Sequence, residues 1–242
     1  MLLGKFFSAS PALVRVAPFV IFVLLTAAQG NSGLPPAYWF YLAKTLVGLW
    51  LILEMIPFVP EMRWAVSWEA VVLGVSIFAV WVGTDGYYPH SSELLQNYVF
   101  PFFKKIGLGF LSSDAKPMAV WNPRAHFGAG LAGLFVIVRI LGSTWVVPPL
   151  EEVFFRSFLY RYVARPNFLD VPLNQFRPIP FLVTAVVFGF EHNEWLAGIF
   201  CGAAYQWLVL RKNRLGDAMT AHAITNFLLG CWVVSRGAWN FW

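Results

Sequence analysis

Apolar runs separated by short polar connections dominate the chain, and a helix needs about 20 apolar residues to cross a bilayer. The alternation over short segments that marks an outer-membrane β-barrel is absent from the sequence. The pattern therefore predicts an all-α, polytopic membrane bundle of about eight transmembrane helices. The expected helices cover residues 12–29, 36–57, 64–83, 128–147, 149–163, 179–192, 194–211 and 217–235.

One polar connection is much longer than the others and covers residues 84–127. We expect one membrane domain over 1–242, with N-terminal spans and this connection in 1–127 and a core in 128–235. Within the connection, Tyr98–Phe110 mixes five aromatic residues with two lysines, which favours a segment on the membrane surface. The first run also resembles a signal peptide, but Arg15 near its start can snorkel, which favours a retained helix.

Composition excludes an ordinary soluble domain. Hydrophobic residues make up 59% of the 242 residues and charged residues 12%, against about 25% charged in soluble domains. The net charge of +5 comes from short Lys and Arg clusters between the apolar runs, which is typical of contacts with lipid headgroups. We therefore expect the lipid bilayer as a partner and no nucleic acid. Cys201 and Cys231 lie inside apolar runs, where no disulfide is expected.

The basic clusters also predict an orientation, because Lys and Arg gather in cytoplasmic connections. With eight spans, residues 84–127, 161–177 and 211–217 would face the cytoplasm and both termini the other side. Lys5, Arg15, Arg63 and Arg236 would then lie outside.

Two glutamates, Glu151 and Glu152, directly follow a Pro-Pro pair that can begin a helix. Arg156 lies four residues past Glu152 on the same helical face, so these two side chains can pair. Glu151, about 100° round the helix, is left free to act as a general base. A buried ionic cluster that only holds helices in register explains the same residues equally well.

Two further motifs, each with a histidine, follow in later apolar runs. His192 lies one turn after Phe188, and His222 one turn before Asn226. His222 and Asn226 can both donate hydrogen bonds towards one point, as a developing oxyanion requires. Each pair alone also fits an ordinary hydrogen-bonded contact between helices.

The order EExxxR, FxxxH, HxxxN on successive membrane helices resembles the CPBP intramembrane proteases, which include the CAAX-processing endopeptidases and bacteriocin-related members. The match covers about residues 128–235, and every polar position is filled. The short Val147-Pro148-Pro149 segment and the compact length are also similar to a bacterial subgroup associated with exosortase systems. The resemblance implies an integral protein of the bacterial inner membrane that cleaves a membrane-associated protein or peptide.

The resemblance also implies roles for the motif residues. Glu151 and His192 would activate a water that attacks a peptide carbonyl, and His222 with Asn226 would stabilise the oxyanion. Glu152 and Arg156 would support them, with Phe188 beside His192.

Members of this family have been described both as metal enzymes and as metal-free glutamic proteases. Glu151, His192 and His222 could bind zinc with an open position. However, the chain lacks HExxH, Arg156 opposes a cation, and Asn226 suits an oxyanion better than a metal. We therefore favour the glutamic type, with no cofactor. Two other functions fit the buried charges: an ion- or proton-coupled transporter, although no internal repeat is found, and a non-catalytic scaffold.

Overall fold

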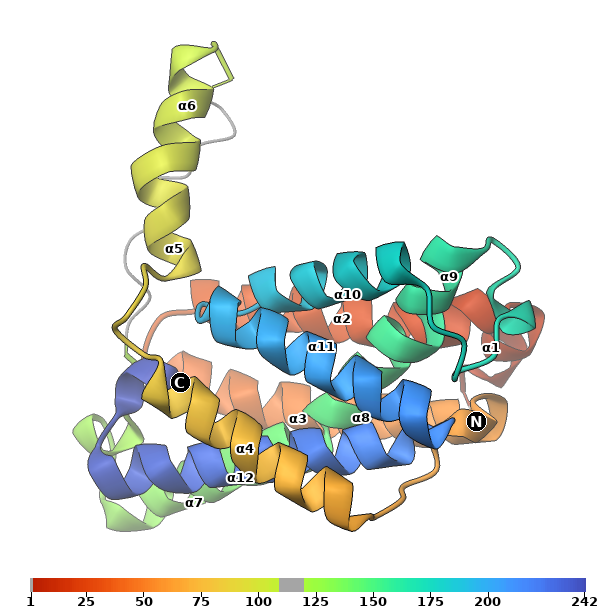
Figure 1. Cartoon of the computed structure of the whole chain (residues 1–242). Helices are drawn as coiled ribbons and strands as arrows, with labels where there is room; N and C mark the ends of the chain where they lie inside the picture. The colour runs from red at the N-terminus through yellow and green to blue at the C-terminus, as the bar shows by residue number, and fades with distance from the viewer. Residues whose placement is uncertain (1, 109–119) are drawn as a thin grey trace.

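The computed structural model describes residues 2–108 and 120–242, and within these ranges the chain is helical and without strands, which confirms the all-α prediction (Figure 1). Caps and prolines begin several helices: the Ser10 hydroxyl accepts from the Leu13 N–H at α2, and Pro178 opens α10. The long helices are α2 (Pro11–Asn31), α3 (Pro36–Met55), α4 (Trp68–Gly83), α7 (Ala129–Trp145), α10 (Pro178–Phe190), α11 (Trp195–Lys212) and α12 (Gly216–Arg236).

Four helices in the described ranges have the length and hydropathy of a membrane span: Pro11–Asn31, Pro36–Met55, Ala129–Ala164 and Gly216–Arg236. Trp68–Gly83 and Pro178–Phe190 are shorter apolar helices. The protein is therefore an integral membrane protein. The expected count of eight separate spans is not confirmed.

The main difference from the expected pattern lies at the Pro148-Pro149 pair. The expected helices 128–147 and 149–163 form one continuous segment of 36 residues, Ala129–Ala164. It consists of α7, α8 (Val147–Glu152), the π-helix η6 (Val153–Leu159) and α9 (Tyr160–Ala164). The prolines lie in the first turn of α8, where a missing N–H costs little, so they do not end the segment.

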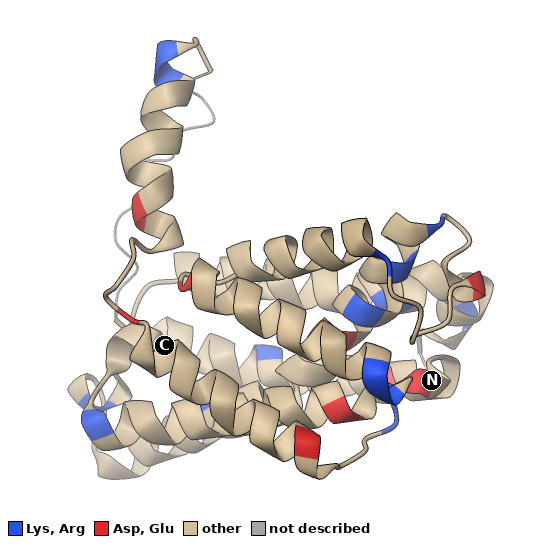
Figure 2. Ribbon diagram, viewed as in Figure 1, with Lys and Arg blue, Asp and Glu red and all other residues tan. Residues whose placement is uncertain are grey.

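This continuity corrects the predicted orientation. The segment passes once through the bundle, so the N- and C-termini of the chain lie at opposite ends of the bundle (Figure 1). Glu61 pairs with both Arg15 and Arg161, which places the start of α2 at the same end as the 161–177 connection. We call this the basic end; its Lys and Arg residues are Lys5, Arg15, Arg63, Arg161, Arg165, Arg177, Arg211, Lys212 and Arg214 (Figure 2).

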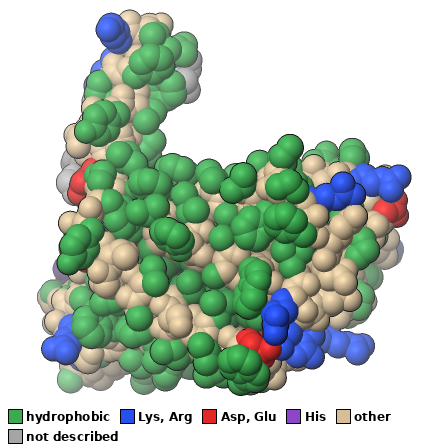
Figure 3. Space-filling model, viewed as in Figure 1, with side chains coloured by type: hydrophobic (Ala, Val, Ile, Leu, Met, Phe, Trp, Pro, Cys, Tyr) green, Lys and Arg blue, Asp and Glu red, His purple; other side chains and the backbone are tan. Residues whose placement is uncertain are grey.

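A basic end agrees better with the positive-inside rule than the predicted arrangement does. The 84–127 connection, which we expected on the same side, leaves α4 at the opposite end (Figures 1 and 2). Between the ends, hydrophobic side chains cover the visible face of the bundle (Figure 3). Leu46, Ile137, Leu182 and Phe200 are among the exposed apolar residues, as expected for a surface that contacts lipid.

Small residues let the helices that carry the motifs approach closely. A Cβ on Gly74 of α4 would meet the Ala221 carbonyl oxygen of α12 at 2.6 Å. A Cβ on Gly198 of α11 would meet the Gly189 Cα of α10 at 2.9 Å. These close contacts bring α4, α10, α11 and α12 together around α8 and η6, as is usual for helix packing in membranes.

A helical arm projects from the bundle at the end opposite the basic end (Figure 1). It consists of α5 (Ser91–Leu94), the π-helix η3 (Leu95–Val99) and α6 (Phe100–Lys105). Tyr98 and Phe102 are exposed on it, as a segment on the membrane surface requires. The last residues of the expected surface segment, 109–110, lie outside the described residues.

Candidate active site

The three motifs converge in the middle of the bundle from three parts of the chain. Glu151 and Glu152 end α8, and Arg156 lies in the π-helix that follows. The other two motifs come from the turn after α10 and from α12, which both pack against this segment. Residues separated by up to 75 positions thus share one polar centre inside an apolar bundle.

Glu152 and Arg156 form the predicted pair. The Arg156 Nε lies 3.1 Å from the Glu152 Oε2, and both side chains are fully buried. The guanidinium also stacks over the Phe188 ring at 4.4 Å and donates to the Gly202 carbonyl at 3.4 Å. A buried charge persists only if it is paired in this way, so Glu152 and Arg156 compensate each other.

His222 connects the two glutamates, which the spacing did not predict. Its Nδ1 lies 3.0 Å from the Glu152 Oε1, and its Nε2 lies 3.8 Å from the Glu151 Oε2. Since a carboxylate accepts, Nδ1 carries the proton of this hydrogen bond. Stacking on the Tyr205 ring, with centroids 5.2 Å apart, also fixes the imidazole plane. The ring therefore presents Nε2 to Glu151.

Glu151 is buried, with 8% of its surface exposed, and its Oε2 has no hydrogen-bond partner among the described residues. The positive charge of Arg156 stabilises the ionised Glu151 carboxylate, whereas the negative charges of Glu152 and Glu191 repel it. Glu151 is therefore the carboxylate of the pair that keeps an oxygen available to a substrate or a water.

His192 is oriented by the backbone of the preceding helix, α10. Its Nδ1 lies 2.9 Å from the Phe188 carbonyl oxygen, which can only accept, so Nδ1 donates and Nε2 keeps its lone pair. The ring packs between Phe188 at 4.9 Å and the edge of Trp81 at 5.2 Å. This tautomer is the one a hydrogen-bond acceptor or base requires.

Asn226 is partly engaged already. Its Nδ2 donates to the Ser143 carbonyl of α7 at 2.8 Å, which holds the carboxamide in place and leaves one of its two N–H groups for another acceptor. With the His222 Nδ1 proton directed at Glu152, the donors left at this point are one Asn226 N–H and, when the imidazole is doubly protonated, the His222 Nε2–H.

The possible zinc ligands do not form a compact set in this geometry. The Glu151 Oε2 and the His222 Nε2 lie 3.8 Å apart. Among the described residues, the ligand atoms of Glu151, His192 and His222 do not all lie within 4.8 Å of one another. Arg156 also acts electrostatically on both Glu151 and His192. The residues as placed do not fit a metal ion.

Several residues at the site could not be found from the motifs. Glu191, next to His192, acts by its charge on Glu151. The Ser143 and Gly202 groups are backbone carbonyls, which leave no mark in a sequence, and Tyr205 looks like any apolar residue of α11. Adjacency to His192 is the one signal that could have identified Glu191.

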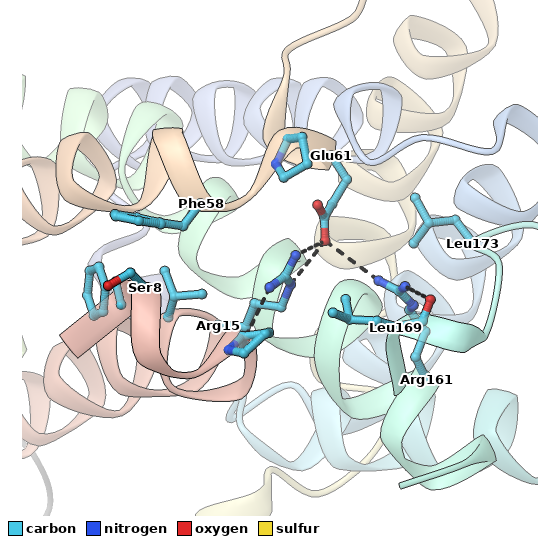
Figure 4. Close-up of a pocket in the computed structure, with 11 residues that line it drawn as sticks. Ser8, Arg15, Phe58, Glu61, Arg161, Leu169 and Leu173 are labelled. Atoms are coloured by element: carbon cyan, nitrogen blue, oxygen red, sulfur yellow. Dashed lines mark hydrogen bonds and ion pairs between the residues drawn. The ribbon is translucent and has the colours of Figure 1, made fainter. Parts of the chain in front are cut away.

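A separate cavity of about 400 Å³ lies at the basic end (Figure 4). On its wall, Glu61 pairs with Arg15 and Arg161 and also accepts from the Ser157 hydroxyl (Figure 4). Ser157 directly follows Arg156 in η6, so this cluster anchors the helix that carries the site. The cavity lining contains none of the motif residues.

Comparison with known proteins agrees with the position of this centre. The model of the family described as Type II CAAX prenyl endopeptidase Rce1-like matches residues 133–228. This segment contains all three motifs. No curated protein and no solved structure matches the chain.

Proposed function

We propose that the chain is an intramembrane endopeptidase of the glutamic type; the match of residues 133–228 to the Rce1-like family model supports this proposal. The chain hydrolyses a peptide bond of a membrane-associated protein or peptide substrate. The observation that carries the mechanism is the free Oε2 of Glu151, which faces the His222 Nε2 while Glu152 is occupied by Arg156.

Glu151 acts as the general base. A water donates one hydrogen bond to the Glu151 carboxylate and the other to the lone pair of the His192 Nε2. As the water oxygen attacks the scissile carbonyl carbon, its proton passes to Glu151. Glu151 then delivers that proton to the leaving amine nitrogen, so that protons and charges balance over the cycle. Base catalysis of this kind contributes roughly 10²–10⁴-fold to a rate.

His222 and Asn226 stabilise the oxyanion. The imidazolium form of His222 keeps its Nδ1–H on the Glu152 carboxylate and directs its Nε2–H at the oxyanion, while Asn226 gives its remaining N–H. The Glu152 contact of 3.0 Å supports this role, because a carboxylate that accepts from Nδ1 orients the ring and leaves Nε2 to face the substrate. The Ser143 contact of 2.8 Å fixes the Asn226 carboxamide, so little reorganisation is needed during the reaction.

The site lies within the bundle, and the face seen in Figure 3 is largely apolar, so the substrate is expected to approach from the membrane. We propose the plasma membrane of a bacterium as its location, with the basic end in the cytoplasm. Prenyl-bearing peptides and sorted, membrane-tethered proteins are the two substrate types to be compared.

The experiment is comparative membrane proteomics of cells that express the wild-type chain or the Glu151→Gln variant. The wild type should produce new peptide termini in one or a few membrane proteins, and the variant should not, at equal abundance. Asp170→Asn, a change at an exposed carboxylate at the basic end, is the matched control and should cleave as the wild type does. Identical termini in wild-type and Glu151→Gln cells would overturn the proposal.

A further inference from the structure

A second cluster of ionisable residues lies outside the candidate active site. Asp85 follows α4, His90 precedes α5, and Glu194 directly precedes α11. One potential ligand atom from each residue lies within 4.8 Å of the other two. The His90 Nε2 lies 3.2 Å from the Asp85 Oδ1. The three residues therefore join the base of the arm to the turn between α10 and α11.

Among the described residues, no Lys or Arg compensates the charges of this cluster. Glu194 is more than nine-tenths buried, with 8% of its surface exposed, and Asp85 repels it. The Trp81 side chain hydrogen-bonds to Glu194 but brings no charge. Two carboxylates held together in this way call for a cation.

His90 has the orientation of a metal ligand. Its Nε2 faces Asp85, while its Nδ1 lies 3.7 Å from the Glu93 carboxylate. Metal-binding histidines usually direct their second ring nitrogen at a carboxylate, which fixes the tautomer and strengthens the ligand. Glu93 lies outside the set of three and occupies this supporting position.

The loops that carry the ligands are already joined by hydrogen bonds. The Ser91 N–H donates to the Asn193 carbonyl at 2.8 Å, and the Trp195 indole donates to the Pro89 carbonyl at 2.9 Å. The Tyr88 hydroxyl accepts from the Ala197 N–H at 3.2 Å. Because both sides are held, a metal ion would have to move side chains rather than backbone.

We propose that Asp85, His90 and Glu194 bind a Zn²⁺ ion that fixes the arm to the turn carrying His192. One imidazole and two carboxylates are established zinc ligands, with water as the fourth. Ligand atoms around tetrahedral zinc are roughly 3.4 Å apart. Side-chain rotations that move the ligand atoms by about 1 Å therefore bring all three within bonding distance of one ion. Calcium and magnesium favour oxygen ligands only, so the imidazole argues against them.

The site is structural. Zinc at this point would hold His192, two residues before Glu194, in register with α4 and the arm. We therefore expect chelation to slow cleavage although the proposed chemistry uses no metal. The inference does not rest on the proposed hydrolysis, since zinc content can be measured without any substrate.

The test is zinc content per chain, measured by mass spectrometry of the purified protein. The sample is stripped with a chelator, re-equilibrated with Zn²⁺ and desalted. We expect about one equivalent in the wild type, and at least a tenfold loss in His90→Gln, Asp85→Asn and Glu194→Gln. His126→Gln, a change at an exposed histidine elsewhere, should keep the metal. Circular dichroism checks that each variant is folded.

A second readout is thermal stability. Zn²⁺ should raise the Tm of the wild type and of His126→Gln, and should leave that of folded His90→Gln unchanged. A wild-type chain that retains less than a tenth of an equivalent would overturn the proposal. So would zinc that survives in His90→Gln but is lost in Glu151→Gln or His222→Gln, because the metal would then belong to the motif residues. Cleavage by the metal-free wild type is measured separately and tests only the proposed mechanism.

Discussion

Replacing Glu152 with glutamine removes one charge from a buried network of three residues. The side-chain amide can still accept from the His222 Nδ1 at about the 3.0 Å seen for the carboxylate. It cannot neutralise Arg156, which is fully buried and 3.1 Å from Glu152. Breaking a buried ion pair by removing one partner costs about 3–5 kcal/mol. We therefore expect a clear fall in the free energy of unfolding.

The same substitution should also slow catalysis. A charge-assisted hydrogen bond contributes about 1.5–3 kcal/mol, which corresponds to roughly 10–150-fold in rate if it is lost only in the transition state. The cost arises because the His222 imidazolium would no longer face a negative group. We expect kcat to fall in this range while KM changes little.

The double variant Glu152→Gln/Arg156→Met separates the two effects. With both charges removed, the buried cost of an unpaired guanidinium disappears, so most of the stability should return. Activity should stay low, because the carboxylate beside His222 is still absent. The assays are thermal unfolding in detergent and peptide cleavage by the purified variants. A double variant less stable than Glu152→Gln, or a single variant with wild-type kcat, would refute the reasoning.

Three other predictions follow from single contacts. Asn226→Ala should lower kcat about 10²–10³-fold with a small change in KM, measured by steady-state cleavage; an unchanged kcat would exclude the oxyanion role. Burial alone would raise the pKa of Glu61, but Arg15 and the hydrogen bonds lower it below its ordinary value, so its stabilisation is full above that value and is lost as pH falls through the lowered pKa. Glu61→Gln should thus lower the Tm at pH 7 and remove this acid-dependent loss, whereas equal pH profiles would contradict the pairing with Arg15 and Arg161. Gly74→Val should destabilise the protein by about 1–3 kcal/mol because its side chain would meet the α12 backbone; an unchanged Tm would argue against this close contact.

Patterns of residues close together in sequence predict the all-α fold class and one ion pair of the site. The all-α bundle follows from the apolar runs, and the Glu152–Arg156 contact follows from a separation of four residues on one helix. Both are local features of the chain. The remaining contacts of the site join residues far apart in sequence, such as His222 with Glu152, and no local rule reports them.

The orientation failed for an equally physical reason. Pro148 and Pro149 were interpreted as a break between two helices, but prolines in a first turn are compatible with a continuing helical path. The side of the membrane predicted for each connection depends on whether a helix ends at these prolines. A break there places Arg15 and Arg161 on opposite sides, although both pair with Glu61. The cluster of Asp85, His90 and Glu194 was missed because Glu194 is more than 100 residues from the other two.

The cleavage rate of the purified Glu151→Gln variant tests the central claim most directly. The substrate is the membrane protein or peptide found by proteomics. The wild type and the variant are compared at equal protein concentration, after thermal unfolding has shown that they have the same Tm. We predict a loss of about 10²–10⁴-fold, because glutamine cannot accept the proton of the attacking water. A folded variant that cleaves within about threefold of the wild type would show that Glu151 is not the base.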